Sequence, residues 1–552
     1  MKKDEGRERK AHLERKESVD FGKKLALTRR QFVSGTGLAG AALLSGIGLR
    51  EAEAAPIPKK WDAQADVVIV GFGGAGACAA IEAARAGASV LLLEKEEMPG
   101  GSTAVSGGIV YSAATKLQKS VGIEDSAEEM FKYLRACGQG KAVDALLRVA
   151  SERSAENIDW LESLGCVFTK ELLALSGMEE EPEYKALTPP KKRGHRCKGT
   201  GAEFFKSLYN GVKAQKNVKI MLKTPATRLI TKLAKTKTNS EVIGVAAKRG
   251  DKDIYIFAKK AVILTSGGIM SGEETKSWLQ DYSPDVARTV PAGSLSATGD
   301  GYRMGMACGA AMKGLNTGGF LPSVMFPGQK VGGIVYVNIW GLPNIYVKQN
   351  GTRFCDEGSY YVLVSEEMIS NKATTAYCIT DSETFKKASD LVPKGIDITR
   401  TIALGLDPRN PEKGIQAGYL WKWDTVAELA NKMGMDAAVL EKTISTYNQN
   451  AESGKDLEFN RKKALVPLKT PPFYAFKIHL GMVCHCGGLS INPKAQVLDT
   501  FDEVIPRLYA AGRDSIGIFG GRYPGSGGAL SDLVTFGRIA GKNAAAEGSQ
   551  KK

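Results

Sequence analysis

The most regular hydrophobic pattern in the chain lies at residues 66–95. Asp66 is followed by Val-Val-Ile-Val, a short run of mostly β-branched residues that predicts a buried parallel strand. Closely spaced glycines then predict a tight turn, and the alanine-rich run 79–84 predicts a helix packed closely on the sheet. A second apolar run, 90–93, ends in an acid. The order strand, turn, helix, strand predicts the first unit of a parallel α/β sheet.

Each glycine of the turn has a mechanical reason. Gly71 permits the turn, Gly73 lets the backbone approach a pyrophosphate, and Gly76 lets helix and strand pack closely. The helix N-terminus offers N–H groups and a favourable dipole to the phosphates. Glu94, 18 residues beyond Gly76, is placed to accept hydrogen bonds from an adenosine ribose. The alternative is a glycine-rich turn that binds nothing, but the strand, helix and terminal acid together favour a dinucleotide site.

Further elements follow along the chain. The pattern predicts helices in 124–165, a polar surface excursion at 170–200 and strands at 218–222, 242–247, 254–258 and 261–264. The segment Lys191–Arg196 is expected to be a solvated basic loop, with a substrate or partner contact as the alternative. From about residue 318 to about 480 strands, turns and helices mix without glycine signals. This change predicts an inserted second domain.

Composition narrows the class of protein. A chain of 552 residues predicts two or more domains, and 43% hydrophobic with 24% charged residues is ordinary for a soluble globular protein. The net charge is +15, of which residues 1–54 carry 12 − 8 = +4, leaving +11 for the rest. This surface charge favours acidic partners. No basic stripe interleaved with aromatic residues is found, so nucleic acid is not expected as a partner.

The nine cysteines are scattered and odd in number, so they predict no disulfide framework. No CxxCH occurs, and the chain is therefore expected to carry no c-type haem. Cys484-His485-Cys486 could suggest a metal ligand set, but no second ligand pair lies at zinc-like spacing. No metal is predicted.

The amino terminus carries an export pattern. Residues 2–30 are rich in Lys and Arg, and an apolar, glycine-rich segment follows that is too weakly hydrophobic for a confident membrane span. At the junction, Thr28-Arg-Arg-Gln-Phe-Val33 resembles a twin-arginine export signal. Residues 1–54 are thus expected to be a signal peptide read by the twin-arginine machinery, and the mature chain to begin near Ala55 in the periplasm or outside the cell. The alternative is a basic tail before a chance apolar helix.

A family resemblance becomes usable after residue 95. Met98-Pro-Gly-Gly-Ser-Thr-Ala-Val-Ser-Gly-Gly108 offers small residues and hydroxyls to a flat ring. Together with the first glycine turn, this stretch resembles the FAD superfamily of fumarate reductase and succinate dehydrogenase flavoproteins, which includes 3-ketosteroid Δ1-dehydrogenases. In the membrane-bound members a histidine after this glycine pair holds the flavin covalently. Ser102 stands at the matching position here, so the resemblance implies non-covalent FAD.

The resemblance covers nearly all of residues 61–548 and implies a fold. It predicts an α/β protein, with a Rossmann-like FAD-binding domain with a β-meander formed by 55–318 and 482–548, and an inserted α+β capping domain at 319–481 that closes over the substrate side. Thr224-Pro-Ala226 matches the family's adenine contact, Ala297-Thr-Gly-Asp-Gly301 its ATGDG element, and the last glycine-rich segment a helix whose N-terminus points at the flavin pyrimidine. The implied FAD-binding residues are Gly71, Gly73, Gly74, Ala75, Gly76, Glu94, Lys95, Gly101, Ser102, Thr103, Gly107, Gly108, Ala226, Ser266, Gly267, Gly268, Asp300, Gly512, Arg513, Gly528, Ala529 and Leu530.

Within the superfamily the fumarate reductase pattern is incomplete. Leu321 stands in place of a clamp histidine, and no arginine occurs between Arg353 and Arg400, where the proton-donating arginine would lie. The family's His-Thr-Met-Gly-Gly becomes Cys-His-Cys-Gly-Gly, so His485 survives only with a shifted register. Arg522 matches the last clamp arginine. These groups are too few to hold a dicarboxylate firmly.

The active-site motifs resemble the ketosteroid dehydrogenases instead. Tyr523-Pro-Gly-Ser-Gly527 matches their YPGxG element, in which a tyrosine hydroxyl and a glycine N–H bind the ketone oxygen. Tyr360 matches the cap tyrosine that handles a proton, with Tyr361 as its rival. Glu357 is expected to be structural and to hold Arg353. The alternatives are a half-buried Tyr360, a Tyr523 that only packs on the flavin, and a His485 that is a polar core residue rather than a proton carrier.

The sequence therefore predicts an exported FAD-dependent oxidoreductase that forms or reduces a C=C bond conjugated to a carbonyl, in a direction it leaves open. Without a haem of its own, it is expected to exchange electrons with a separate carrier, such as a c-type cytochrome or a quinone-linked protein. One alternative is a reductase of fumarate-like or acrylate-like acids. Another, from a different class, is a flavin-binding electron-transfer protein without a substrate.

Overall fold

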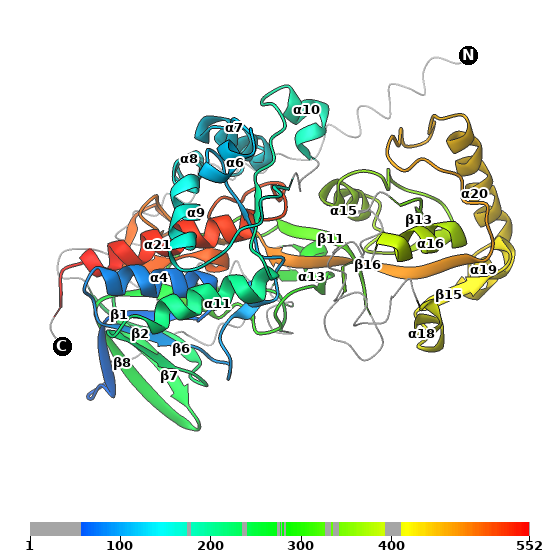
Figure 1. Ribbon diagram of the computed structural model, residues 1–552. Helices are drawn as coiled ribbons and strands as arrows, with labels where there is room; N and C mark the ends of the chain where they lie inside the picture. The colour runs from blue at the N-terminus through cyan, green and yellow to red at the C-terminus, as the bar shows by residue number, and fades with distance from the viewer. Residues whose placement is uncertain are drawn as a thin grey trace, which may run out of the picture. The chain divides into compact units, whose positions relative to one another are not determined.

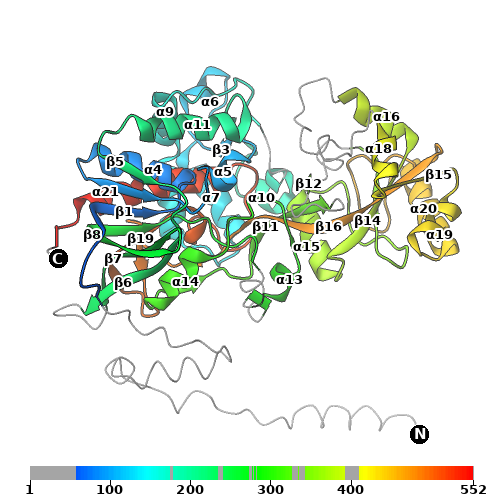
Figure 2. The same cartoon turned by 90° about the horizontal axis from the view of Figure 1, so that it is seen from below.

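The computed structural model describes residues 57–173, 178–233, 240–272, 277, 279–280, 283–325, 333–334, 342–391 and 410–550 (Figures 1 and 2). The predicted signal peptide and the predicted mature start near Ala55 lie outside these residues. The described residues of Pro56–Lys232 and Ser240–Lys552 belong to one compact unit. In the described part of the chain, none of the helices has the length and apolar character needed to cross a bilayer.

An eight-stranded sheet forms the first layer, in the order β18-β19-β8-β1-β2-β5, with β7 beside β8 and β6 beside β7. The pairs β1–β2, β1–β8, β2–β5 and β8–β19 are parallel, whereas β7–β8 is antiparallel. The strands are β1 (Ala63–Val70), β2 (Val90–Leu93), β5 (Val218–Met221), β6 (Ala226–Leu233), β7 (Ser240–Arg249), β8 (Lys252–Leu264), β18 (Gln496–Leu498) and β19 (Val504–Ala510). The predicted α/β fold is confirmed.

The sequence predicts two separate strands at 254–258 and 261–264, but the structure has one. β8 runs through Lys259 and Lys260 without a break and pairs with β1 along both halves. Its first half also pairs with β7, so the predicted hairpin is present. The lysine pair is only half-buried, which allows two charged residues inside a strand that is otherwise apolar at its carboxyl end. β8 thereby joins the β-meander to the parallel sheet.

Three helices pack beside this sheet: α4 (Gly74–Arg85), α11 (Thr200–Lys213) and α21 (Gly528–Ala546). Small residues let α4 and α21 lie side by side, as Figure 1 shows. A Cβ added at Gly537 would come within 2.7 Å of the carbonyl oxygen of Ala75, and one at Gly541 would overlap that of Ala79. The close packing of α4 on α21 therefore requires small residues where the two helices meet.

A helical subdomain follows the first βαβ unit. Its elements are α5 (Gly101–Ala104), β3 (Ile109–Tyr111), α6 (Lys116–Ser120), α7 (Ala127–Gly138), α8 (Asp144–Glu152), α9 (Ser154–Ser163), η2 (Met178–Glu180), α10 (Pro182–Lys185) and β4 (Gly194–Arg196). Ser126 caps α7 by accepting a hydrogen bond from the Glu129 N–H, and Met130, Phe131 and Leu134 are buried. The helices predicted in 124–165 are thus present.

The predicted solvated loop at 191–196 is wrong in its second half. Arg193 is fully buried and pairs with Asp125 at 2.7 Å, and His195 is fully buried with its Nε2 2.8 Å from the Thr115 hydroxyl. Sequence reasoning treated a dense basic run as solvated. Here β4 pairs with β3 and carries these side chains into the subdomain, where acceptors satisfy them.

A second, seven-stranded sheet has the order β12-β11-β16-β14-β13, with β15 and β9 also pairing with β16. β16 (Phe473–His485) runs from α19 and α20 to the first layer in both views (Figures 1 and 2). The other strands are β9 (Val290–Pro291), β11 (Gly318–Val324), β12 (Gly333–Ile334), β13 (Ile345–Val347), β14 (Thr375–Asp381) and β15 (Leu420–Trp423); a separate pair joins β10 (Met312–Lys313) to β17 (Gly488–Leu489). The remaining helices are α13 (Pro284–Ala287), α14 (Asp300–Ala307), α15 (Tyr361–Ser370), α16 (Ser382–Leu391), α18 (Pro411–Gln416), α19 (Val426–Met433), α20 (Ala437–Glu452) and η4 (Gly512–Asp514).

A buried ionic cluster stabilises this second sheet. Glu357 accepts hydrogen bonds from Arg353 at 2.7 and 2.9 Å and from Arg461 at 3.1 Å, and Arg353 also pairs with Asp456 at 3.0 Å. All four side chains are buried. Glu357 holds Arg353, as the sequence predicts. The boundaries of the inserted domain at 318/319 and 481/482 stay predictions.

Candidate active site

A cavity of about 630 Å³ opens where β1, β2 and β8 end and where α4 and α21 begin. It has the size of a ligand-binding cleft. The predicted cofactor residues that line it are Gly71, Gly73, Gly74, Ala75, Glu94, Lys95, Gly101, Ser102, Thr103, Gly107, Gly108, Ala226, Ser266, Gly267, Asp300, Gly512, Arg513, Ala529 and Leu530. The other three, Gly76, Gly268 and Gly528, lie next to this wall but are not part of it.

The first glycine turn has the geometry that a dinucleotide needs. Gly71 has φ +102°, and a Cβ there would overlap the carbonyl of Thr265. A Cβ at Gly76 would overlap the Gly71 carbonyl, so the close packing of helix on strand requires glycine. A Cβ at Gly73 would meet only the Gly100 oxygen, 4.0 Å away. The open space at Gly73, in front of the α4 N-terminus, fits a pyrophosphate.

Charged groups stand near the ends of the adjoining strands. Glu94 follows β2 and accepts hydrogen bonds from the N–H groups of Phe72 and Glu96, both at 2.9 Å. Lys95 Nζ lies 2.7 Å from both the Asp300 carboxylate and the Thr298 hydroxyl. Both acids are therefore fixed by donors within the protein while they line the cavity, which orients their remaining acceptor positions.

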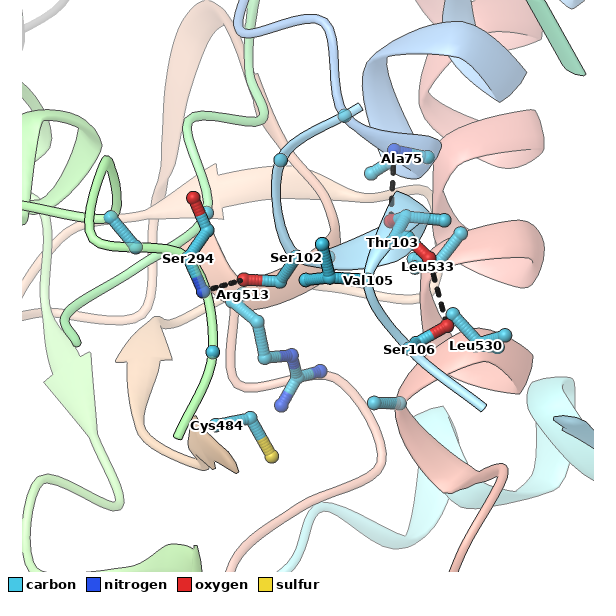
Figure 3. A pocket seen from close by; sticks show the side chains of 18 of the residues that line it. Ala75, Ser102, Thr103, Val105, Ser106, Ser294, Cys484, Arg513, Leu530 and Leu533 are labelled. Atoms are coloured by element: carbon cyan, nitrogen blue, oxygen red, sulfur yellow. Dashed lines mark hydrogen bonds between the residues drawn. The ribbon is translucent and has the colours of Figure 1, made fainter. Parts of the chain in front are cut away.

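The segment after β2 brings hydroxyl groups to the cavity (Figure 3). The Ser102 hydroxyl accepts a hydrogen bond from the Ser294 N–H at 3.2 Å, and the Thr103 hydroxyl accepts one from the Gly74 N–H at 3.1 Å. The Ser106 hydroxyl donates to the Thr103 carbonyl at 2.8 Å. These contacts join the segment to the glycine turn and to the loop before α14.

The opposite wall is the N-terminus of the 19-residue helix α21. Gly527 precedes it with φ +98°, and a Cβ there would lie 2.9 Å from the Tyr111 nitrogen. Nearby, Arg513 forms an ion pair with Asp532, and its guanidinium lies 3.9 Å from the centre of the Phe519 ring. The helix dipole makes the wall suited to negative charge on a bound group, while Asp532 compensates the charge of Arg513.

Two of the five predicted catalytic residues line the cavity: Tyr523 and Gly527. The Tyr523 ring is buried and lies parallel to Phe519, with 5.7 Å between the ring centres. Burial raises the pKa of Tyr523 well above its usual value, so the phenol stays protonated at neutral pH.

Tyr360 lies behind its neighbour. It is the N-cap of α15, and its ring centre is 4.2 Å from that of Tyr361. Tyr361, the rival candidate, lines the cavity while Tyr360 does not. Burial raises the pKa of Tyr361 to about 12. The three-residue offset from Glu357 selects Tyr360, the N-cap of α15, whereas Tyr361, its first residue, lines the cavity.

Arg522 and His485 are also not part of the wall. Arg522 is held by Glu366 at 2.8 Å and Glu183 at 2.5 Å, which neutralise its charge away from the cavity. His485 Nε2 lies 2.9 Å from the Leu315 carbonyl oxygen. Successive side chains of a strand point to opposite faces, so Cys484 faces the cavity and His485 does not. Relative to the family's His-Thr-Met-Gly-Gly segment, the histidine of this chain is shifted by one residue. This shift turns the imidazole away from the cavity.

Sequence reasoning missed further wall residues. Arg196 was assigned to a surface loop, and Cys484 was considered only as a metal ligand, yet both line the cavity with Met270, Val483 and Ser526. Strand alternation around the Cys-His-Cys segment could have found Cys484. No sequence pattern places Arg196 there, because the pairing of β4 with β3 joins segments 85 residues apart. Within the described residues no group of three His, Cys, Asp or Glu side chains could hold a metal ion.

Comparisons with known proteins agree with this geometry. The chain is 31% identical over 483 residues to the fumarate reductase (cytochrome) of Shewanella frigidimarina, covering 87% of this chain and 77% of that protein. It is 30% identical to the urocanate reductase of Eggerthella lenta, over 90% and 77%. The solved 3-ketosteroid-Δ4-(5α)-dehydrogenase of Rhodococcus jostii RHA1, in complex with 4-androstene-3,17-dione, is 27% identical with a TM-score of 0.70, covering 89% of this chain and 99% of that chain.

The glycine turn, the parallel sheet and the helix-flanked cavity define a flavoprotein oxidoreductase of the fumarate reductase and ketosteroid dehydrogenase type. Residues 66–530 match the FAD binding domain family, and the chain belongs to that family. Its cofactor is FAD, and it is a FAD-dependent oxidoreductase acting on CH–CH groups. The predicted cofactor and enzyme class are confirmed.

Proposed function

We propose that the protein forms or reduces a C=C bond conjugated to the carbonyl of an enone or ketosteroid-like substrate, with FAD held non-covalently. Bound FAD supplies hydride transfer at N5. The observation that carries the proposal is the wall beside the α21 N-terminus, where Tyr523 and Gly527 accompany the apolar Leu321. Leu321 occupies the position at which fumarate reductases have a clamp histidine. Ser102, in place of a flavin-linking histidine, supports non-covalent binding.

Tyr523 and Gly527 bind the substrate carbonyl in this proposal. A phenol that burial keeps protonated is a hydrogen-bond donor, and the Gly527 N–H at the start of α21 is a second one. Donors fixed in a dry site stabilise the negative charge that develops on a carbonyl oxygen during reaction. Two such donors replace the charged clamp that a dicarboxylate requires.

Tyr361 moves the proton on the neighbouring carbon. It replaces the predicted Tyr360, because Tyr361 lines the cavity together with Ser526, whereas Tyr360 does not.

A second candidate function is reduction of a fumarate-like or acrylate-like acid. Arg196 favours it, because this guanidinium lines the same cavity and could pair with one carboxylate. The names of the two reductases reported above agree with this candidate. Arg513 is a weaker partner, since Asp532 already compensates its charge.

Export and an external electron carrier complete the proposal. The twin-arginine pattern at Arg29-Arg30 supports delivery of the folded protein to the periplasm. The chain carries no CxxCH motif, whereas a 31% identical relative is named a cytochrome-type fumarate reductase. A separate c-type cytochrome or quinone-linked protein is the carrier that this chain would need, and the net charge of +11 outside residues 1–54 suits an acidic partner.

An anaerobic reoxidation experiment tests the substrate class. Purified holoenzyme is reduced chemically, and fumarate, an acrylate-type acid and a 3-keto-4-ene are added in turn while the flavin absorbance is followed. Reoxidation by the enone alone is expected. Tyr523→Phe should slow that step about 100-fold, the size of effect seen when one oxyanion donor is lost, whereas Arg196→Gln should leave it unchanged.

Other results have definite meanings. Fast reoxidation by an acid that is lost in Arg196→Gln would replace the enone proposal with the enoate candidate. A flavin that none of the compounds reoxidises, while a cytochrome does, would favour an electron carrier without a substrate of its own. An unaffected Tyr523→Phe variant would remove Tyr523 from the chemistry.

A further inference from the structure

Two cysteines beside the cavity have no function in the reaction described above. Cys484 lies at the end of β16 and Cys486 two residues further, and both are more than nine-tenths buried. Their sulfur atoms are 3.8 Å apart. Cys484 lines the cavity, and Figure 3 shows its sulfur in the part of the cavity that also holds the Arg513 side chain. Residue 485 points away from the cavity. Cys486 follows the end of β16 and contacts Cys484, but it is not part of the cavity wall.

The thiol pair stands at the reactive end of the cavity. A Cβ added to Gly319 would lie 2.9 Å from Cys484 Sγ and 3.2 Å from Cδ2 of Tyr523. The sulfur is therefore a close neighbour of the proposed carbonyl-binding tyrosine. It also shares the cavity with the α21 N-terminus, which the resemblance places against the flavin ring.

The two thiols differ in acidity. The contact with Cys486, together with the Arg513 charge and the Gly319 N–H, lowers the pKa of Cys484 despite its burial. Burial raises the pKa of Cys486 well above its usual value, and the neighbouring Cys484 adds to the rise. A thiol of lowered pKa with a second thiol in contact is the arrangement of a reactive cysteine rather than of an inert core cysteine.

We propose that Cys484 and Cys486 form a redox-active dithiol that exchanges an electron pair with bound FAD. The pair is a second two-electron store beside the flavin, and it is a site for thiol–disulfide chemistry in addition to the CH–CH reaction. Closing the bond requires the sulfurs to approach from 3.8 Å to about 2.0 Å. Rotation about the two Cα–Cβ bonds with a small adjustment at the end of β16 supplies this approach.

The step balances with FAD as oxidant. Starting from the Cys484 thiolate and the Cys486 thiol, formation of the S–S bond breaks one S–H bond and releases one proton and two electrons. Oxidised FAD accepts the electron pair and the proton. In the reverse direction reduced FAD breaks the S–S bond and returns one thiolate and one thiol.

The test counts electrons and identifies the oxidised peptide. Cys166 and Cys197 form another close pair, with sulfurs 3.2 Å apart, so Cys166→Ala is the parent in which only one pair remains. Air-oxidised holoenzyme of this parent is titrated with dithionite without air, until unconsumed dithionite marks the end point. The parent should take up four electrons per flavin, and Cys166→Ala/Cys486→Ala should take up two. Cys166→Ala/Cys378→Ala, which removes a buried cysteine of β14, should keep four.

Peptide mapping assigns the extra electrons and does not depend on any substrate. Trypsin releases Ile478–Lys494, which contains both cysteines and no other. Before reduction this peptide should resist alkylation and be lighter by two hydrogen atoms; at the end point it should carry two alkyl groups. Equal uptake of two electrons in parent and variant, or an alkylated peptide in the air-oxidised protein, would overturn the proposal. A disulfide that persists after the flavin is fully bleached would overturn the exchange with FAD.

The dithiol proposal can be wrong while the proposed CH–CH function is right, because the two experiments are independent. The dithiol experiment uses no enone and no acid, and the reoxidation experiment uses no thiol readout. Loss of FAD from the Cys486→Ala variant would be seen in the flavin-to-protein absorbance ratio, and electron counts are expressed per flavin for that reason.

Discussion

At the scale of single residues, one position along β16 separates a group that can touch the substrate from one that cannot. Cys484 faces the cavity, while His485 is enclosed by Tyr302 and the Leu315 carbonyl. Burial and the nearby Arg513 charge lower the pKa of His485 to about 4. The imidazole is therefore neutral at pH 7, and it is not part of the cavity wall.

The buried imidazole makes stability depend on pH. Because the pKa of His485 is lower in the folded than in the unfolded chain, the unfolded state binds more protons between about pH 6.5 and 4, and stability falls as pH falls through that window. Between pH 7 and pH 5 we expect protonation of His485 in the unfolded chain to lower the free energy of unfolding of the wild type by about 2 kcal/mol. In His485→Gln that part of the loss should be absent, so denaturant unfolding curves of the two proteins should converge as pH is lowered. Curves that stay equally separated would show that His485 does not titrate on unfolding.

Residue identities were predictable where one backbone conformation allows one residue type. Gly71 and Gly76 follow from the turn and the helix contact alone, and Tyr523 and Gly527 follow from a short motif. Tyr360 against Tyr361 could not be decided, because the choice depends on where α15 begins. A helix boundary uncertain by one residue changes which side chain reaches a cavity.

At the scale of elements, glycines of the strand–turn–helix unit are required for two different reasons. At Gly76 the space for a Cβ is filled by the Gly71 carbonyl and, at 2.9 Å, by the Thr265 hydroxyl, whereas at Gly73 it is open. Gly76 is needed for close packing of helix on strand, and Gly73 leaves space for the ligand.

Two alanine substitutions should therefore fail in different ways. Gly76→Ala should destabilise the protein by about 3 kcal/mol, because the helix must move away from β1, and FAD should be lost with the fold. Gly73→Ala should change the free energy of unfolding by less than about 1 kcal/mol but weaken FAD binding, since the methyl group occupies the space in front of the α4 N-terminus. Thermal unfolding and flavin content measure the two effects. Equal thermal stability of both variants would contradict the packing argument.

Elements with strong local patterns could be predicted, and those decided by distant partners could not. β1, α4 and β2 follow from periodicity and glycine placement. The division of β8 into two strands was an error caused by Lys259 and Lys260. These residues lie at a register shift between two stretches of β8, 256–258 and 261–264, that both pair with β1. β4 likewise depends on β3, far along the chain.

At the scale of the whole molecule, both ends of the described chain build one site. Gly71–Ala75 forms one wall of the cavity and Gly527–Leu530 contributes to another, and α4 packs on α21. The second sheet joins this arrangement through β16, whose last residues reach the cavity. A resemblance that covers nearly the whole sequence could predict this architecture, which composition alone could not.

Export should depend on the arginine pair. In a host with a twin-arginine system, Arg29→Lys/Arg30→Lys should keep the protein in the cytoplasm with FAD bound, because the residues predicted to bind FAD all lie between Gly71 and Leu530. Cell fractionation with flavin fluorescence of the purified protein measures both properties. Lys23→Arg/Lys24→Arg, which keeps the charge and the arginine pair, should still be exported. Periplasmic protein from the first variant would show that the pair is not an export signal.

The shared wall of α4 and α21 also sets an order in time. Translation delivers the glycine turn early and the opposing helix almost last, so a nascent chain on the ribosome holds only part of its cofactor site. Until α21 emerges, the small residues of α4 have no partner and the phosphate-binding turn has no opposite wall. A molecule that holds flavin in the complete site has therefore been translated through α21, and a chain cut short by a premature stop before α21 should fail to retain flavin.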